Sequence, residues 1–172
     1  MKFPIEEYER IKDAPFVREN VVWPVSTTEV SHEPSWGATI LLYVKTLFSN
    51  GSEYFLLTPP AAQRFSEILW RDVRNYLSSD LTQEPSLLQE LDFPKERFDQ
   101  LAEENAFKGK RPIWPTSVVG VSRDLDLGDA TMIIQIGGYL HKKPSHFLMT
   151  PPAAKQLARA LTRTVDGYLD SA

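Results

Sequence analysis

The octapeptide FLLTPPAA at residues 55–62 returns as FLMTPPAA at residues 147–154, 92 residues further along the chain. The likeness extends outward on both sides, where Trp23-Pro24 matches Trp114-Pro115 and Phe3-Pro4 matches Phe93-Pro94. The offset between matched positions grows only from 90 to 92 residues, so two single-residue insertions account for it. Such a long internal repeat indicates a duplicated structural unit. We therefore divide the chain into a first repeat, residues 1–80, a linker, residues 81–91, and a second repeat, residues 92–172.

Each repeat has the pattern of a short opening helix, three strands and a long closing helix. The closing helices are the clearest elements, because Thr58 and Thr150 are good N-caps and the prolines that follow fall in the first turn. An apolar stripe with helical spacing then follows in both copies. The predicted strands cover about residues 24–31 and 115–122, start again near Ala38 and Ala130, and end with Tyr54–Leu57 and His146–Met149.

The second strand of each repeat is apolar on both faces, which decides the predicted packing. Ile40, Leu42 and Val44 point one way, while Leu41 and Tyr43 point the other. The closing helix covers one face, and the other repeat is the nearest cover for the second face. We predict an α+β fold of two tandem β-β-β-α repeats. Each is a three-stranded antiparallel meander with a C-terminal helix, preceded by a short helix, and the two form a pseudo-twofold, dimer-like arrangement. Whether the repeats meet by sheet faces or by strand edges stays open.

Composition narrows the function classes. The 172 residues include no cysteine, which excludes disulfides and thiolate chemistry, and no apolar run long enough for a signal peptide or a membrane span. We therefore expect a cytoplasmic protein without membrane contact. The net charge is −4, with −5 in residues 1–90 and +1 in residues 91–172. No basic stripe is visible along the sequence, so we expect no direct nucleic acid binding.

Motifs for chemistry are sparse. Asp124, Asp126 and Asp129 lie close to Gly128, which suggests a calcium loop. An EF-hand loop, however, has its glycine at position six and a glutamate at position twelve, whereas here the glycine is at position five and no such glutamate follows. A solvated turn is therefore the simpler interpretation. His141 and His146 could share a metal, yet their counterparts in the first repeat could not. The sequence has no phosphate loop and no nucleophile elbow. We predict no catalytic residues, no metal and no cofactor.

The aromatic side chains separate a shared structural role from a role special to one repeat. Trp23 and Trp114 recur, which favours structure, whereas Trp36 and Trp70 do not recur. Trp70 also lies off the apolar stripe of its helix, so it either packs on the linker or the other repeat or contacts a partner. We take Trp36, Trp70 and Tyr43 as candidate partner-binding residues.

The run Val22–Thr27, the apolar strand Ile40–Val44 and the stretch Leu56–Leu69 resemble the small enterobacterial BssS family. That family pairs a Trp-x-x-Ser-Thr strand with a Leu-Thr-Thr-x-x-Ala-Arg-Gln-Phe-x-x-Ile-Leu helix start. Here Pro59-Pro60 replace the polar pair, and the chain is a tandem whereas the family is single. The resemblance implies a role in regulating biofilm formation and signalling, and it carries over no catalytic residue.

Two classes of function remain from the sequence. The first is a non-enzymatic regulatory or protein-binding module of a bacterial or phage-type cytoplasmic protein. It would bind a protein partner through the acidic first repeat, for example as an inhibitor or immunity protein. The alternative is a small-ligand sensor, or an enzyme, with its site in the groove between the repeats. The sequence does not indicate an oligomeric state.

Overall fold

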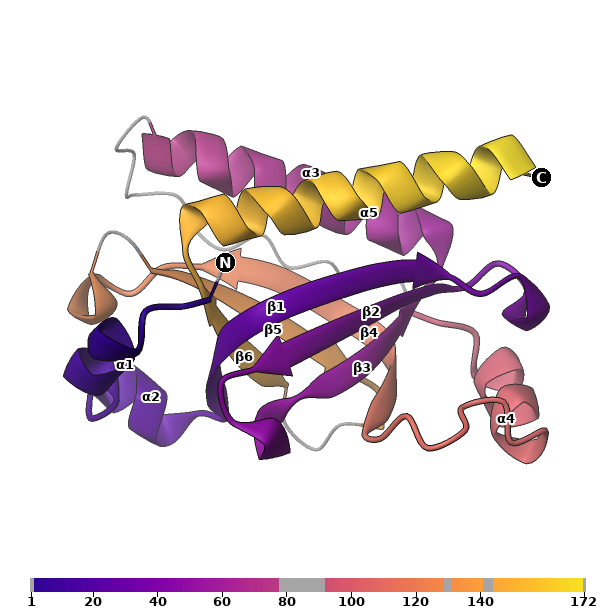
Figure 1. Ribbon diagram of the computed structural model, residues 1–172, viewed down its shortest axis with the longest axis horizontal. Coiled ribbons are helices and arrows are strands. Elements are labelled where there is room, and N and C mark those ends of the chain that lie inside the picture. Colours follow the sequence, from indigo (N-terminus) through magenta and orange to yellow (C-terminus); the bar gives the residue numbers. More distant parts are fainter. Residues whose placement is uncertain (1, 78–91, 129–130, 141–143, 172) are drawn as a thin grey trace.

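The computed structural model describes residues 2–77, 92–128, 131–140 and 144–171 (Figure 1), and the predicted linker, residues 81–91, lies outside them. The first repeat contains α1 (Ile5–Ile11), α2 (Pro15–Glu19), β1 (Val22–His32), β2 (Ile40–Thr46), β3 (Glu53–Leu57) and α3 (Pro59–Leu77). The second repeat contains α4 (Lys95–Glu103), β4 (Ile113–Ser122), β5 (Met132–Gly138), β6 (Ser145–Met149) and α5 (Pro151–Ser171). Short 3-10 turns occupy Pro34–Trp36, Ser49–Gly51 and Leu125–Leu127.

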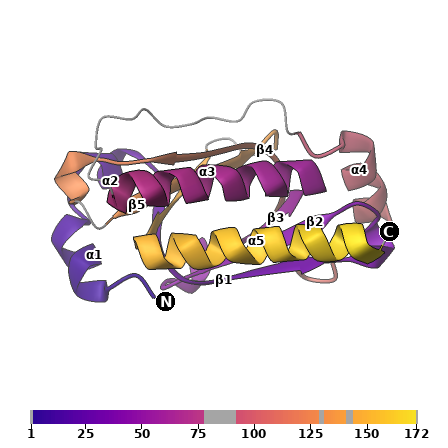
Figure 2. The ribbon, with the colours of Figure 1, turned by 90° about the horizontal axis from the view of Figure 1, so that it is seen from above.

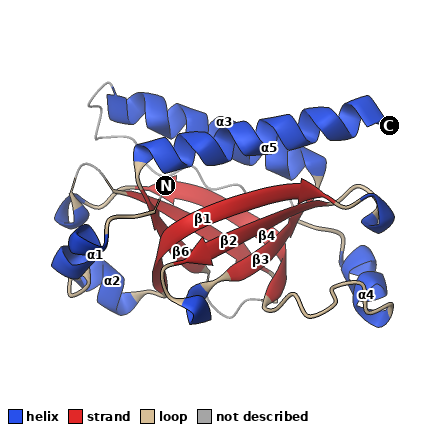
Figure 3. Ribbon diagram, in the orientation of Figure 1, coloured by secondary structure: helices blue, strands red, loops and turns tan. Residues whose placement is uncertain are grey.

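The six strands form a single closed barrel in the order β1-β2-β3-β4-β5-β6 (Figure 3). Neighbours within a repeat pair antiparallel, whereas β3 pairs with β4, and β6 with β1, in parallel. The prediction of two tandem β-β-β-α units in a dimer-like arrangement is therefore wrong. The sheets are not separate, because their edge strands bond to each other and one mixed barrel results.

The two joints between the repeats have matching registers. In one joint Trp23 lies opposite Phe147, and in the other Trp114 lies opposite Phe55. The first strand of each repeat also has a register shift at a matching place, between Val25 and Thr27 and between Thr116 and Val118. Such an irregularity bends a strand and increases its twist, which helps a sheet curl into a barrel.

Helices α3 and α5 lie side by side and form one layer over the barrel (Figure 2). Their apolar stripes share one core with the inward side chains of both repeats' strands, among them Ile40, Leu42, Ile134 and Ile136, all with no exposed surface. Helix prolines are tolerated here because they stand at the starts of the helices, where a missing N–H is no loss. No helix in the described ranges is both long enough and apolar enough to cross a membrane.

The opening helices exchange places between the repeats. Phe3 and Ile11 of the first repeat pack with Ile133 and Leu148 of the second, in a cluster separate from the main core. The opening segment of the second repeat packs on the first repeat in the same way, because Phe93 and Leu101 contact Leu41 and Leu56 in a third cluster. The outer apolar face of each sheet is thus covered by the opening helix of the other repeat.

Arginines reinforce this exchange at two glycine turns. Arg97 of α4 donates to the carbonyl of Ala38 (3.1 Å), and Arg10 of α1 donates to the carbonyl of Leu127 (3.1 Å). Each acceptor adjoins a glycine, Gly37 or Gly128, with φ of 74° or 92°. A left-handed backbone of this kind favours glycine, which explains why glycine stands in both turns.

His146 on β6 is buried where α2 meets the barrel. Only 9% of its surface is exposed, and its ring meets Phe16 edge-on with 5.2 Å between ring centres. Its Nδ1 atom is buried without a hydrogen-bond partner among the described residues. Burial lowers the pKa of His146 below its ordinary value of 6.5 because a charged imidazole would lose its hydration, and a backbone contact with Val21 opposes this in part.

The helix caps give the first testable prediction. Thr58 Oγ1 accepts from the Ala61 N–H (3.3 Å), and Thr150 Oγ1 accepts from the Ala153 N–H (3.4 Å). We expect Thr58→Ala and Thr150→Ala each to lower the free energy of unfolding by about 1 kcal/mol, measured by urea denaturation. The matched serine variants keep the hydroxyl and should lose much less. A clear loss at one cap with none at the other would show that the two helix starts are not equivalent.

His146 gives the second prediction. Because its folded pKa lies below the unfolded value, the unfolded chain binds the extra proton more readily. The stability that neutral His146 provides is present above pH 6.5 and is lost as the pH falls below that value. We expect the free energy of unfolding to drop more between about pH 7.5 and about pH 5.5 in the parent protein than in His146→Gln. Equal pH profiles for the two proteins would contradict this expectation.

Candidate functional site

The interior of the barrel is filled by side chains. Phe55 on β3 and Phe147 on β6 meet edge-to-face with 5.9 Å between ring centres, although their strands are not neighbours. The contact therefore spans the barrel, and the surrounding isoleucines and leucines are fully buried. A barrel with so few strands leaves room only for its own side chains. Candidate sites must lie on the outside.

The two long helices approach closely at a crossing of small residues. Ser66 of α3 donates to the carbonyl of Ala158 of α5 (2.8 Å), and its hydroxyl lies 2.6 Å from that of Thr162. Ser66 is buried, with 1% of its surface exposed, so the bonds satisfy a polar group that would otherwise be costly to bury. The crossing fixes the two helices against each other and creates a continuous outer surface.

Trp70 lies in the seam between these helices. Its ring packs in part against the barrel core, and the Arg159 guanidinium of α5 lies 5.8 Å from the ring centre. Arg74 donates from Nε to the carbonyl of Trp70 (3.3 Å). Arg159 thus adds a cation–π contact that joins the two repeats through Trp70. Trp70 does pack on the other repeat, and it remains half-exposed.

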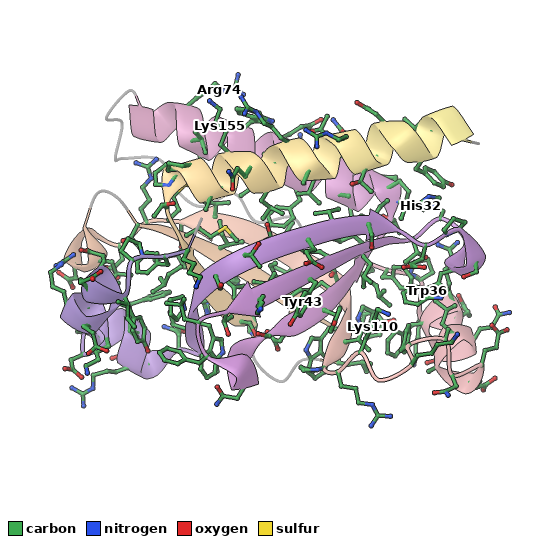
Figure 4. The ribbon with its side chains drawn as sticks, in the orientation of Figure 1. His32, Trp36, Tyr43, Arg74, Lys110 and Lys155 are labelled. Atoms are coloured by element: carbon green, nitrogen blue, oxygen red, sulfur yellow. The ribbon has the colours of Figure 1, made fainter. Side chains whose placement is uncertain are left out.

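Basic side chains gather around Trp70. In the view of Figure 4, Arg74 of α3 and Lys155 of α5 are both drawn at the outer side of the helix layer, where α3 ends and α5 begins. We define the basic seam as Trp70, Arg74, Lys155 and Arg159. None of its three cations has an ion pair with a described residue, whereas Arg64, nearer the start of α3, pairs with Glu67 (3.0 Å). Within the part of the chain that the structure describes, the seam is therefore positive.

The helix layer as a whole has the same bias. Among the described side chains of α3 and α5, six cations are exposed or half-exposed: Arg64, Arg71, Arg74, Lys155, Arg159 and Arg163. Only two carboxylates in the same set are exposed, Glu67 and Asp166. Asp72 does not add to this surface, because it is largely buried beside Arg123, 3.5 Å from Oδ2 to Nε. Burial raises the pKa of Asp72, and the nearby Arg123 opposes the rise.

The other two candidate residues lie elsewhere. Trp36 is only 7% exposed and packs with Leu41, Phe93 and Leu101, and its ring meets Phe107 edge-on at 5.5 Å. Trp36 therefore covers the joint with α4, and partner contact by it stays a prediction. It lies away from Tyr43, which is on the outer side of the barrel (Figure 4).

Tyr43 forms a small aromatic surface of its own. It is half-exposed and stacks on Tyr54 of β3, with 4.3 Å between ring centres and 18° between planes. Partial burial raises the pKa of Tyr54, and the neighbouring Tyr43 and Glu29 raise it further. This pair belongs to the outer face of β2 and β3, so the structure does not bring Tyr43, Trp36 and Trp70 into one site. Contact of Tyr43 with a partner also stays a prediction.

Among the described residues, hollows open at two places beside the helix layer. One of about 210 Å³ lies between β1 and α5, below the range usual for ligand sites. The other, of about 580 Å³, lies between the start of α3 and the end of α5, and both repeats line it. The sequence left open a small-ligand sensor or an enzyme with its site in a groove between the repeats, and this hollow is where such a site would lie. That function stays a prediction.

The proposed turn at Asp124 is seen in part. Asp124 Oδ1 accepts from the Asp126 N–H (2.8 Å), a local bond common in turns. Asp129 and His141 lie outside the described residues. Within the described ranges, no three histidine or acidic side chains are grouped closely enough to hold a metal.

Sequence reasoning found Trp70 because tryptophan at that position breaks the repeat. It missed Arg74, Lys155 and Arg159, which come from two helices far apart in the chain. A helical-wheel comparison of the two closing helices could have placed their cations on matching outer faces.

Comparison of the chain with protein-family models, with curated proteins and with solved structures finds no match. The resemblance to the BssS family stays a prediction, and any functional conclusion depends on the geometry of the helix layer.

Proposed function

We propose that the protein is a non-enzymatic protein-binding module whose contact surface is the basic seam of α3 and α5. The observation that carries the proposal is Trp70, half-exposed and held under Arg159 in a rigid helix pair. Tryptophan and arginine are the residues most enriched where binding energy concentrates. A side chain already fixed by its own fold loses little freedom on binding, which favours affinity.

The charge of the seam favours an acidic segment of the partner. Arg74, Lys155 and Arg159 can meet carboxylates around the tryptophan, and such complementarity speeds association and selects partners. The acidic character of the first repeat suggested a basic partner, but the surroundings of Trp70 have the opposite sign. The exposed Glu67 and Asp166 on the same layer, together with the net charge of −4, favour a protein over a nucleic acid.

A regulatory role is consistent with this surface. An inhibitor or immunity protein acts by covering a surface of an enzyme, and it needs a rigid scaffold with a few strong anchors rather than reactive groups. The filled barrel supplies rigidity, and the helix layer supplies the anchors. We therefore propose that the protein regulates its partner, as an inhibitor or immunity protein does, in a bacterial or phage-type setting.

The third prediction tests the seam by charge reversal. We expect the protein to capture a partner that Lys155→Glu and Arg159→Glu no longer capture at moderate salt. The matched control is Arg64→Glu, which reverses a cation of the same layer that already pairs with Glu67, and it should retain the partner. Once the partner is identified, Trp70→Ala should weaken binding by about 2 kcal/mol or more in titration calorimetry.

Thermal unfolding of the same variants separates binding from folding. The charge variants change one half-exposed and one exposed side chain, so their unfolding temperatures should stay near that of the parent protein. A large loss of stability in Trp70→Ala with unchanged affinity would assign Trp70 to packing alone. Retention of the partner by both charge variants, or capture of nucleic acid in its place, would contradict an acidic protein partner.

A further inference from the structure

The larger hollow beside the helix layer has the size of a small-molecule site. Its volume is about 580 Å³, within the range of roughly 300–1,000 Å³ usual for such sites. Most of its lining is apolar and comes from both repeats: Ala38, Pro59, Pro60, Gln63, Val165, Asp166, Tyr168 and Leu169. The hollow lies at the end of the helix layer away from the basic seam, because α3 and α5 run antiparallel (Figure 2).

The walls of the hollow are fixed by the fold. Pro59 and Pro60 form the first turn of α3, and Val165 of α5 belongs to the main core with 4% of its surface exposed. The ring of Tyr168 meets His32 edge-on with 4.8 Å between ring centres. Leu169 is the exception, since 62% of its surface is exposed to solvent. An apolar ligand body would cover it.

The start of α3 offers no site for an anion. A helix start usually binds anions through free N–H groups, but Pro59 and Pro60 have none. The next two N–H groups are engaged, because Ala61 donates to Thr58 Oγ1 (3.3 Å) and Ala62 donates to the Thr58 carbonyl (2.9 Å). Among the residues that line the hollow, Asp166 alone has a formal charge. The hollow therefore favours a cation.

The matching positions at the other end of the layer are both cationic, whereas in the hollow one is neutral and the other is a carboxylate. Gln63 and Asp166 correspond in the repeat to Lys155 and Arg74, each pair 92 residues apart. Both ends keep the threonine cap and the two prolines, so the helix starts are built alike. The difference in charge is what distinguishes the hollow from the basic seam.

We propose that this hollow binds a small apolar molecule that carries a protonated amine. Its apolar body packs against Pro59, Val165 and Leu169, and its ammonium group donates to the carboxylate of Asp166 and the amide oxygen of Gln63. The site is separate from the basic seam and goes beyond the proposed function. It gives the protein a second ligand that can be present whether or not a partner is bound.

The fourth prediction uses three probes with the same indole body. Tryptamine is a cation, tryptophol is neutral and indole-3-propionate is an anion. We expect amide NMR signals of Gln63, Val165 and Leu169 to shift on titration, with tryptamine about threefold to fivefold tighter than tryptophol. Indole-3-propionate should bind weakest. Absence of binding at millimolar tryptamine, equal affinities for the three probes, or shifts confined to other parts of the protein would overturn the proposal.

Variants assign the preference to one side chain. Asp166→Asn should remove the advantage of tryptamine over tryptophol while the affinity for tryptophol stays the same. Leu169→Ala removes apolar surface and should weaken both probes alike. Lys45→Gln, which changes an exposed charge that neither lines the hollow nor belongs to the basic seam, is the control and should change neither. An unchanged tryptamine preference in Asp166→Asn would overturn the proposal, and the seam variants test the protein partner independently.

Discussion

The pairing of strand edges between the two repeats is the constraint on which the rest of the structure depends. A three-stranded meander leaves two edges whose N–H and C=O groups lack partners, and such edges invite aggregation. Here each edge strand of one repeat pairs in parallel with an edge strand of the other, so neither edge of either meander is left without a partner strand. Closure places α3 and α5 in one layer and carries each opening helix to the opposite repeat.

Local signals in the sequence predicted the order of the elements but not their assembly. Thr58 with its prolines marked a helix start, and the alternation from Ile40 to Val44 marked a strand, because capping and strand periodicity are local properties. The apolar outer face carrying Leu41 required a cover, and this need is satisfied equally by a second sheet or by a helix. The cover is the helix that follows Phe93, a contact between repeats that no local pattern specifies.

The candidate site was predictable to the same limited degree. Trp70 and Trp36 both stood out because neither tryptophan recurs in the second repeat. Trp70 is half-exposed, whereas Trp36 is buried against α4. A departure from a repeat therefore marks a specialised position without telling packing from binding. Charge counted along the chain suggested an acidic surface, but folding brings Arg74 and Arg159 together across two helices, and only their joint placement produces the seam.

The exchange of opening helices also has a consequence for biosynthesis. When β2 and β3 have left the ribosome, the apolar face carrying Leu41 and Leu56 waits for α4, and the edge of β1 waits for β6, the last strand to be made. The first repeat thus spends most of translation with an open edge, and its apolar face stays uncovered until α4 has been made. Long-range closure of this kind is slow and exposed to misassembly. Until β6 has been made, the edge of β1 can pair with a strand of another chain instead.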